Sequence, residues 1–97
     1  MTDGLAGFRR RIDECDAQIV HWINERLKVC QEVGRFKVEH GMRVRVPERE
    51  EEVIARALGR NQGPCSPETL EKLFRILIET AVVLEQQQGE DRPKGKP

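Results

Sequence analysis

Residues 8–37, FRRRIDECDAQIVHWINERLKVCQEVGRFK, contain the feature that most constrains the fold: an apolar seam with an arginine inside it. Rows at this spacing predict a helix that packs against other helices. A buried cation without a partner is costly, so the arginine must face a pocket or reach a carboxylate. Counting by sevens gives two interleaved rows, which are Phe8, Cys15, Trp22, Val29, Phe36 and Ile12, Ile19, Arg26, Val33.

A second cation, Lys37, follows Arg26 by eleven residues. Eleven residues are close to a whole number of helical turns, so the two side chains lie within about 20° of each other around the axis. Two cations on one apolar face indicate a site for an anionic ligand. The alternative is that Arg26 only extends past the seam to a carboxylate.

The length of this helix predicts association between chains. No proline interrupts residues 5–40, so a helix there would be about 50 Å long, against a radius of gyration of about 13 Å for a compact domain of this size. A single domain of 97 residues cannot cover it. We expect an intertwined homodimer in which the long helices of two chains bury each other's seams.

The rest of the chain predicts two further helices and an all-α fold. Gly41 suits the end of the long helix, Pro47 the first turn of a second, and Ser66 the N-cap of a third. Residues 1–88 would form one helical domain, and residues 89–97, rich in Pro and Gly, a disordered tail. The three expected helices per chain are one long, one short and one medium, at residues 5–40, 47–58 and 67–88.

The composition argues against several classes of function. Basic and acidic residues, 17 of each, cancel to zero net charge, which argues against general nucleic-acid binding. The three cysteines lack metal-ligand spacing, so we expect reduced thiols in a cytoplasmic protein. No segment approaches the ~20 apolar residues that cross a bilayer, and no signal peptide is apparent. We therefore predict no membrane association, no metal and no cofactor.

Charged residues from all three predicted helices face inward. Besides Arg26 and Lys37, Glu50 lies on the apolar face of the second helix, with Arg49 at its border, and Glu85 continues the apolar stripe of the third. The alternative for Arg49 and Glu50 is an exposed helix start with ordinary salt bridges, which is the favoured interpretation for Arg49 alone. The alternative for Glu85 is a solvent-exposed position at the frayed end of the bundle. Such a set is suited to holding a small dianion and stabilising negative charge that develops on an oxygen.

Nucleophilic chemistry has no support in the sequence. No Ser, Cys or His is arranged with a base, and we interpret His21 and His40 as isolated surface residues. Arg9 adds another cation, 17 residues before Arg26, which places it about 25 Å away along the axis and about 100° around it. Within one chain these two arginines cannot share a ligand. In an antiparallel dimer, Arg9 could complete the site of the partner chain.

The order of these residues resembles the all-helical chorismate mutases. The resemblance covers residues 5–88 and implies an intertwined homodimer with two equivalent sites, each using an arginine from the opposite chain. It also implies a cofactor-independent [3,3] rearrangement of chorismate to prephenate. The matching pieces are FRRRIDECD, NERLKVCQEVGRFK, VPEREEEVI and LFRILIETAVVLEQQ.

The resemblance implies roles for the substrate-binding residues. Arg9 of the partner and Arg26 would bind the two carboxylates of the substrate, and Arg49 would support the site near one of them. Lys37 would donate to the ether oxygen, and Glu50 would hold the substituent at ring carbon 4. The apolar walls would come from Val33 and Ile78.

Three positions depart from the commonest family pattern. Glu85 replaces a frequent Gln, and a carboxyl must be protonated to donate a hydrogen bond, so activity should fall as pH rises. Val46 and Ala81 replace an Asp and a small hydroxyl residue near the ring hydroxyl and a carboxylate. This change favours slightly the analogue 4-amino-4-deoxychorismate, used in antibiotic biosynthesis, whose ammonium would pair with Glu50.

Two other functions remain open from the sequence. An isochorismate pyruvate-lyase would share the fold and the cations. A non-catalytic helical dimer that regulates a shikimate-pathway enzyme is the other alternative, although retained cations in its core would then have no purpose. A larger enzyme that activates this chain is also compatible with the resemblance.

Overall fold

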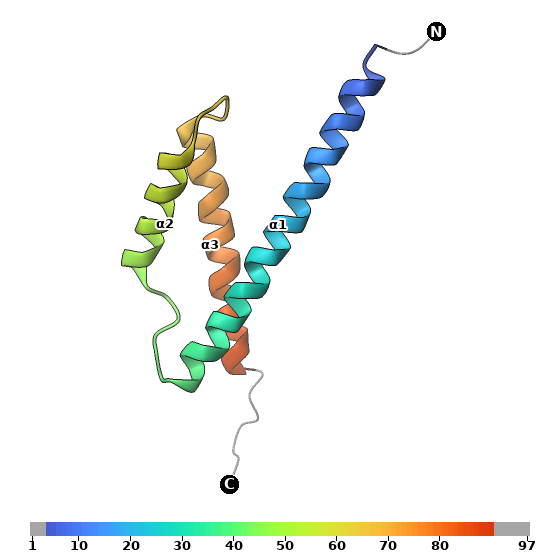
Figure 1. Cartoon of the computed structure of the whole chain (residues 1–97). Helices are drawn as coiled ribbons and strands as arrows, with labels where there is room; N and C mark the ends of the chain where they lie inside the picture. The colour runs from blue at the N-terminus through green and yellow to red at the C-terminus, as the bar shows by residue number, and fades with distance from the viewer. Residues whose placement is uncertain (1–3, 91–97) are drawn as a thin grey trace.

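The computed structural model describes residues 4–90, which form three helices and no strand (Figure 1). This arrangement confirms the predicted all-α class with one long, one short and one medium helix. Helix α3 continues through Gly89, which the sequence assigned to the disordered tail. A methyl group built on Gly89 would touch Val38 at 3.4 Å, so packing against the long helix accompanies this extra turn. Residues 91–97 lie outside the described part. The helices are α1 (Ala6–Glu39), α2 (Pro47–Arg60) and α3 (Pro67–Glu90).

Helix α1 ends where the sequence predicts. Gly41 has a φ of 63°, a conformation that glycine adopts without steric cost. Its N–H donates to Val38 O at 3.3 Å, and the N–H of Met42 donates to Lys37 O at 2.8 Å. These two bonds form the Schellman motif that satisfies the last carbonyls of a helix. The chain is thereby turned back toward the start of α2.

The starts of α2 and α3 also follow local sequence signals. Pro47 occupies the first turn of α2, and Glu48 and Glu50 lie at its positive end. At the start of α3, the Thr69 N–H donates to Ser66 Oγ at 3.1 Å, which confirms the predicted N-cap. Helix α2 runs two residues beyond its predicted end because Gly59 remains helical.

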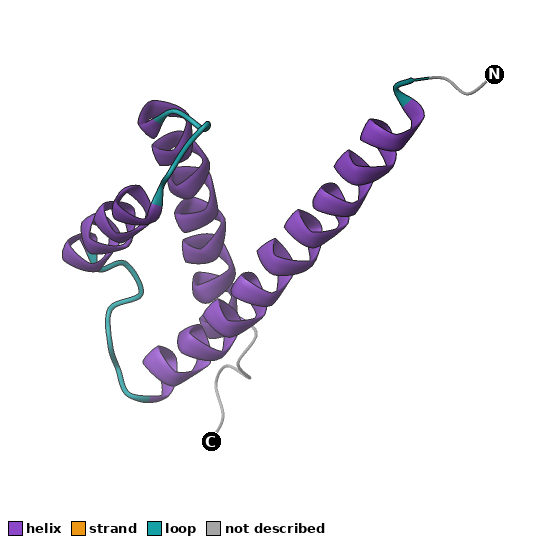
Figure 2. Cartoon of the chain, turned by 45° about the horizontal axis from the view of Figure 1, so that its top comes forward, coloured by secondary structure: helices purple, strands orange, loops and turns teal. Residues whose placement is uncertain are grey.

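Helix α3 packs against both other helices, and the small core lies along it. Ile54 of α2 and Ile78, Ala81 and Val82 of α3 are buried. The C-terminal half of α1 lies against α3, whereas its N-terminal half extends past the other two helices (Figure 2). The radius of gyration is 18.2 Å, well above the value of about 13 Å expected for a compact domain of this length.

The apolar seam of α1 is left largely uncovered, both along that extension and at Val29 and Phe36 in the C-terminal half. The seam residues Phe8, Ile12, Ile19 and Trp22 are each more than half exposed. The expectation that one chain cannot cover its long helix is confirmed, while the homodimer itself stays a prediction. Within residues 4–90, none of the helices has the length and apolar character needed to cross a membrane.

Candidate functional site

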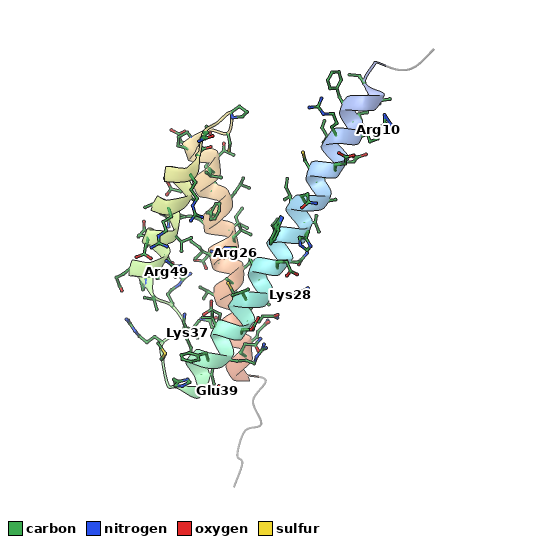
Figure 3. All side chains as sticks on the ribbon, viewed as in Figure 1. Arg10, Arg26, Lys28, Lys37, Glu39 and Arg49 are labelled. Carbon is green, nitrogen blue, oxygen red and sulfur yellow. The ribbon has the colours of Figure 1, made fainter. Side chains whose placement is uncertain are left out.

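A cavity of about 410 Å³ opens between α1, the connection at residues 42–46, α2 and α3. Its walls contain every site residue predicted from the sequence except Arg9. In Figure 3, Arg26 and Lys37 of α1 and Arg49 of α2 lie toward the space between the helices, and Arg10 lies far away near the N-terminal end. The predicted residues that line the cavity are Arg26, Val33, Lys37, Val46, Arg49, Glu50, Ile78, Ala81 and Glu85.

Lys37 is held at one end of this cavity by two acceptors. Its Nζ donates to Val44 O at 2.7 Å and to Glu85 Oε1 at 3.0 Å. The side chains of Lys37 and Glu85 are only 16% and 10% exposed, so little water competes for these bonds. An ammonium has three N–H donors. One donor therefore remains for a molecule in the cavity.

In the structure the hydrogen-bond partner of Glu85 is Lys37, whereas the family resemblance implied the substrate. The inward orientation of Glu85 is confirmed, since the residue is 7% exposed. In the structure its carboxylate accepts a hydrogen bond from Lys37, whereas the sequence suggested that a protonated Glu85 donates. Helical periodicity placed the two residues on inward faces but could not pair them across helices.

Arg26 is half-buried and points into the cavity with few partners of its own. Among residues 4–90, its side chain makes one hydrogen bond, from Nη1 to Cys30 Sγ at 3.8 Å. A thiol is a weak acceptor, so the guanidinium keeps most of its donors for another group. Burial raises the pKa of the Cys30 thiol above its ordinary value of 9.0, while the charge of Arg26 acts in the opposite direction.

Glu50 lines the cavity, and one of its carboxylate oxygens is shielded from solvent. Its Oε2 has no hydrogen bond within the described part of the chain. The Nε of Arg45 lies 3.0 Å from the same oxygen as an ion-pair partner, without the angle of a hydrogen bond. Arg45 also pairs with Glu79 of α3. Sequence reasoning missed Arg45, although its place next to Val46 in the predicted connection could have suggested it.

Arg49 has a mixed environment. It lines the cavity, but its side chain is 58% exposed and pairs with Glu52 on the same helix. The sequence left two alternatives for Arg49, a place in the site and an exposed place at the helix start. In the structure Arg49 both lines the cavity and is exposed. Arg9 lies on the exposed N-terminal half of α1 and outside the cavity. Its predicted role in the site of a partner chain stays a prediction.

The remaining walls are apolar. Ile78 and Ala81 are buried, Val46 is partly exposed, and Val33 is exposed. Sequence reasoning did not select Val44 and four other apolar or thiol residues of the walls, which are Val29, Cys30, Val53 and Val82. His21 and His40 are exposed, as predicted. Within the described ranges, no three His, Cys, Asp or Glu side chains come together as metal ligands.

The sequence profile of the family described as chorismate mutase type II matches residues 8–86, which span all three helices and the cavity. The chain belongs to this family. A solved structure described as chorismate mutase (form II) from Thermus thermophilus superposes with a TM-score of 0.84 at 32% identity. The alignment covers 89% of this chain and 98% of that one.

Curated relatives of this chorismate mutase type II chain fall into two size classes. A chorismate mutase from Methanocaldococcus jannaschii is 31% identical over 94% of this chain and 93% of its own length. A bifunctional chorismate mutase/prephenate dehydratase from Stutzerimonas stutzeri is 37% identical over 88% of this chain. The chain spans only about a quarter of that bifunctional relative, since 25% of its length is covered.

Proposed function

We propose that this chain catalyses the rearrangement of chorismate to prephenate. The observation that carries the proposal is the composition of the cavity. Its walls are largely apolar and also contain the cations of Arg26, Lys37 and Arg49 and the carboxylate of Glu50. Chorismate carries two carboxylates, a ring hydroxyl and an ether oxygen. The arginines would bind the carboxylates, Glu50 would accept from the hydroxyl, and Lys37 would donate to the ether oxygen.

The reaction itself needs no nucleophile and no cofactor. In the [3,3] rearrangement, the ether C–O bond breaks as a new C–C bond forms, and no proton or electron enters or leaves. Binding both carboxylates would hold the substrate in its folded, reactive shape, which lowers the entropic part of the barrier. Negative charge develops on the ether oxygen as the bond breaks. The remaining N–H of Lys37 would donate to that oxygen and stabilise the transition state more than the ground state.

The contact between Arg45 and Glu50 supports chorismate over its 4-amino analogue. With Arg45 Nε 3.0 Å from Glu50 Oε2, a protein cation already offsets the carboxylate charge. A substrate ammonium would enter beside that cation, whereas a hydroxyl could donate to Glu50 without repulsion between like charges. The slight sequence-based preference for the amino substrate also lacks support from the relatives described above, which are named for chorismate.

The active form in this proposal is a homodimer. The exposed apolar residues of α1 support it, because a free helix would leave Phe8, Ile12, Ile19 and Trp22 in water. An antiparallel second copy would cover this seam and bring its Arg9 to the carboxylates of the substrate. A further enzyme domain or partner that acts on the product, as in the bifunctional relatives, is compatible with this arrangement.

The test follows the loss of the chorismate diene absorbance and identifies the product. Wild-type protein should convert chorismate to prephenate, and Lys37→Ala should lower kcat by roughly 10²–10³-fold. Lys28→Ala is the matched control, since Lys28 lies on the same helix, is exposed and pairs with Glu25. Its activity should equal that of the wild type.

The alternatives give different products. Release of pyruvate from isochorismate would indicate the lyase instead. Binding without turnover of chorismate or its 4-amino analogue would indicate a regulatory dimer. Faster turnover of the 4-amino analogue than of chorismate would overturn the substrate assignment while leaving the reaction class in place.

A further inference from the structure

A second cavity, of about 530 Å³, lies beside the first along α2 and the start of α3. We call it the arginine cleft, because its walls contain Arg26, Arg49, Arg56 and Arg60. Among the described residues, none of those that line it is acidic. Glu52 pairs with Arg49 and, at 3.6 Å, with Arg56, so one acidic group serves two of the four cations. The remaining wall is largely apolar, from Val53, Ala57, Leu70 and Phe74.

Such a cleft fits an amphipathic acidic helix better than a small anion, because half of its wall offers nothing to an anion. The exposed half of α1 carries acidic residues beside its apolar seam, after the three arginines at residues 9–11. Asp13 and Asp16 are exposed and lie next to the uncovered seam residues Ile12 and Ile19. Arg9, Asp13 and Asp16 are spaced at i, i+4 and i+7, so they form one stripe along the helix.

The spacing of the arginines along α2 matches the spacing of this stripe on α1. Helices α1 and α2 run in opposite directions along the molecule (Figure 1). The α1 of an antiparallel second copy would therefore run in the direction of α2. With its Arg9 beside Arg49, its Asp16 would lie about 10.5 Å further on, and Arg56 lies the same seven residues, about 10.5 Å, beyond Arg49. Arg60 follows one turn later.

We propose that Asp13 and Asp16 of a second copy enter the arginine cleft, with Asp16 level with Arg56, Asp13 about one turn before it and Arg60 one turn beyond it. These opposite charges would set the register that delivers Arg9 to the neighbouring site. This inference rests on the homodimer of the proposed function. It adds a specificity device: opposite charges favour one antiparallel register, and a shift of two turns toward the N-terminus of α2 would take both Asp13 and Asp16 away from Arg56 and Arg60.

Charge reversal in two separate chains tests the pairing. In a dimer of D13K/D16K chains, or of R56E/R60E chains, like charges face each other at both contacts between α1 and the arginine cleft. In a mixed dimer every contact is again between opposite charges. Each variant alone should dimerise at least about tenfold more weakly than the wild type, and the mixture should recover most of the affinity. Glu14→Lys, on another side of the same exposed helix, is the matched control and should keep wild-type affinity.

Sedimentation measures the dimerisation, and circular dichroism of the separate and mixed chains shows whether helix content returns on mixing. Mixed chains that associate no better than the separate variants, beside a dimeric and active wild type, would overturn the charge pairing alone. A wild type that stays monomeric while inactive would overturn the proposed dimeric enzyme as well. These two outcomes differ in the wild-type measurements, so the failures can be told apart.

Discussion

Gly34 of α1 lies directly against the backbone of Glu85 in α3. A Cβ built on Gly34 would stand 2.7 Å from Glu85 Cα, closer than real Cβ atoms approach other heavy atoms. The absence of a side chain lets the two helices cross at this point. Lys37 is one turn further along α1, so the crossing brings its ammonium within 3.0 Å of the Glu85 carboxylate. Helix packing and the chemistry of the cavity therefore depend on the same contact.

Gly34→Ala should destabilise the protein and weaken catalysis. The added methyl meets backbone, which cannot rotate away, so we expect a loss of about 1–3 kcal/mol in the free energy of unfolding. The forced shift would also displace Glu85 and lower activity. Gly59→Ala is the control, because a Cβ at Gly59 meets nothing within 4 Å among the described residues. Urea unfolding should show that this variant is slightly stabilised, by about 0.4–1 kcal/mol. Equal stability of the two variants would contradict the packing argument.

Glu85→Gln should change the pH dependence of the reaction. The resemblance implies that a protonated Glu85 donates a hydrogen bond to the substrate, whereas the structure shows its carboxylate accepting one from Lys37. Under the first role, wild-type kcat/KM falls as pH rises. A glutamine amide donates at every pH, so the variant should have a flatter profile. Glu71→Gln, on the same helix but outside the cavity, should keep the wild-type slope. An identical slope in Glu85→Gln would remove the donor role and leave Glu85 as the partner of Lys37.

Arg45→Gln should alter substrate preference. Removal of the cation beside Glu50 leaves the carboxylate charge uncompensated, so a substrate ammonium would be favoured more than before. We expect the ratio of kcat/KM for the 4-amino analogue to that for chorismate to rise by several-fold. Arg43→Gln, on the same connection and exposed, serves as the control. A ratio that changes equally in both variants would show that Arg45 has no specific influence.

Cys30 gives a chemical probe of the cavity. Burial raises the pKa of its thiol above 9.0, so the reactive thiolate is scarce at neutral pH. In a variant whose other cysteines are changed to serine, iodoacetamide should react slowly, with a rate still rising above pH 9. Bound substrate or product should slow the reaction further, because Cys30 lines the cavity. A rate that levels off below pH 9, or no protection by ligand, would contradict this description.

Periodicity and capping residues were enough to predict most of the backbone. The long helix, its end at Gly41, the start of α2 at Pro47 and the cap at Ser66 follow from local chemistry. The end of α3 was missed because Gly89 signals termination locally. Its helical conformation is accompanied by contact with Val38, which is distant in sequence.

The cavity was predicted by its residues but not by its contacts. Helical spacing turned Arg26, Lys37 and Glu85 inward, and the family resemblance supplied Val46 and Ala81. The pairing of Lys37 with Glu85 and of Arg45 with Glu50 depends on how helices cross, which one-dimensional periodicity does not encode. Gly34 follows Val33 of the seam and is buried, and its significance emerges only from the close approach of α3.

The most direct test of the central claim is activity after mixing two inactive chains, Arg9→Ala and Lys37→Ala. In a mixed dimer, one site combines the intact Lys37 of one chain with the intact Arg9 of the other. Random mixing should therefore restore about a quarter of wild-type chorismate turnover per chain, since half of the dimers are mixed and each has one complete site. No recovery, although sedimentation shows that mixed dimers form, would contradict a site completed by Arg9 of a second copy.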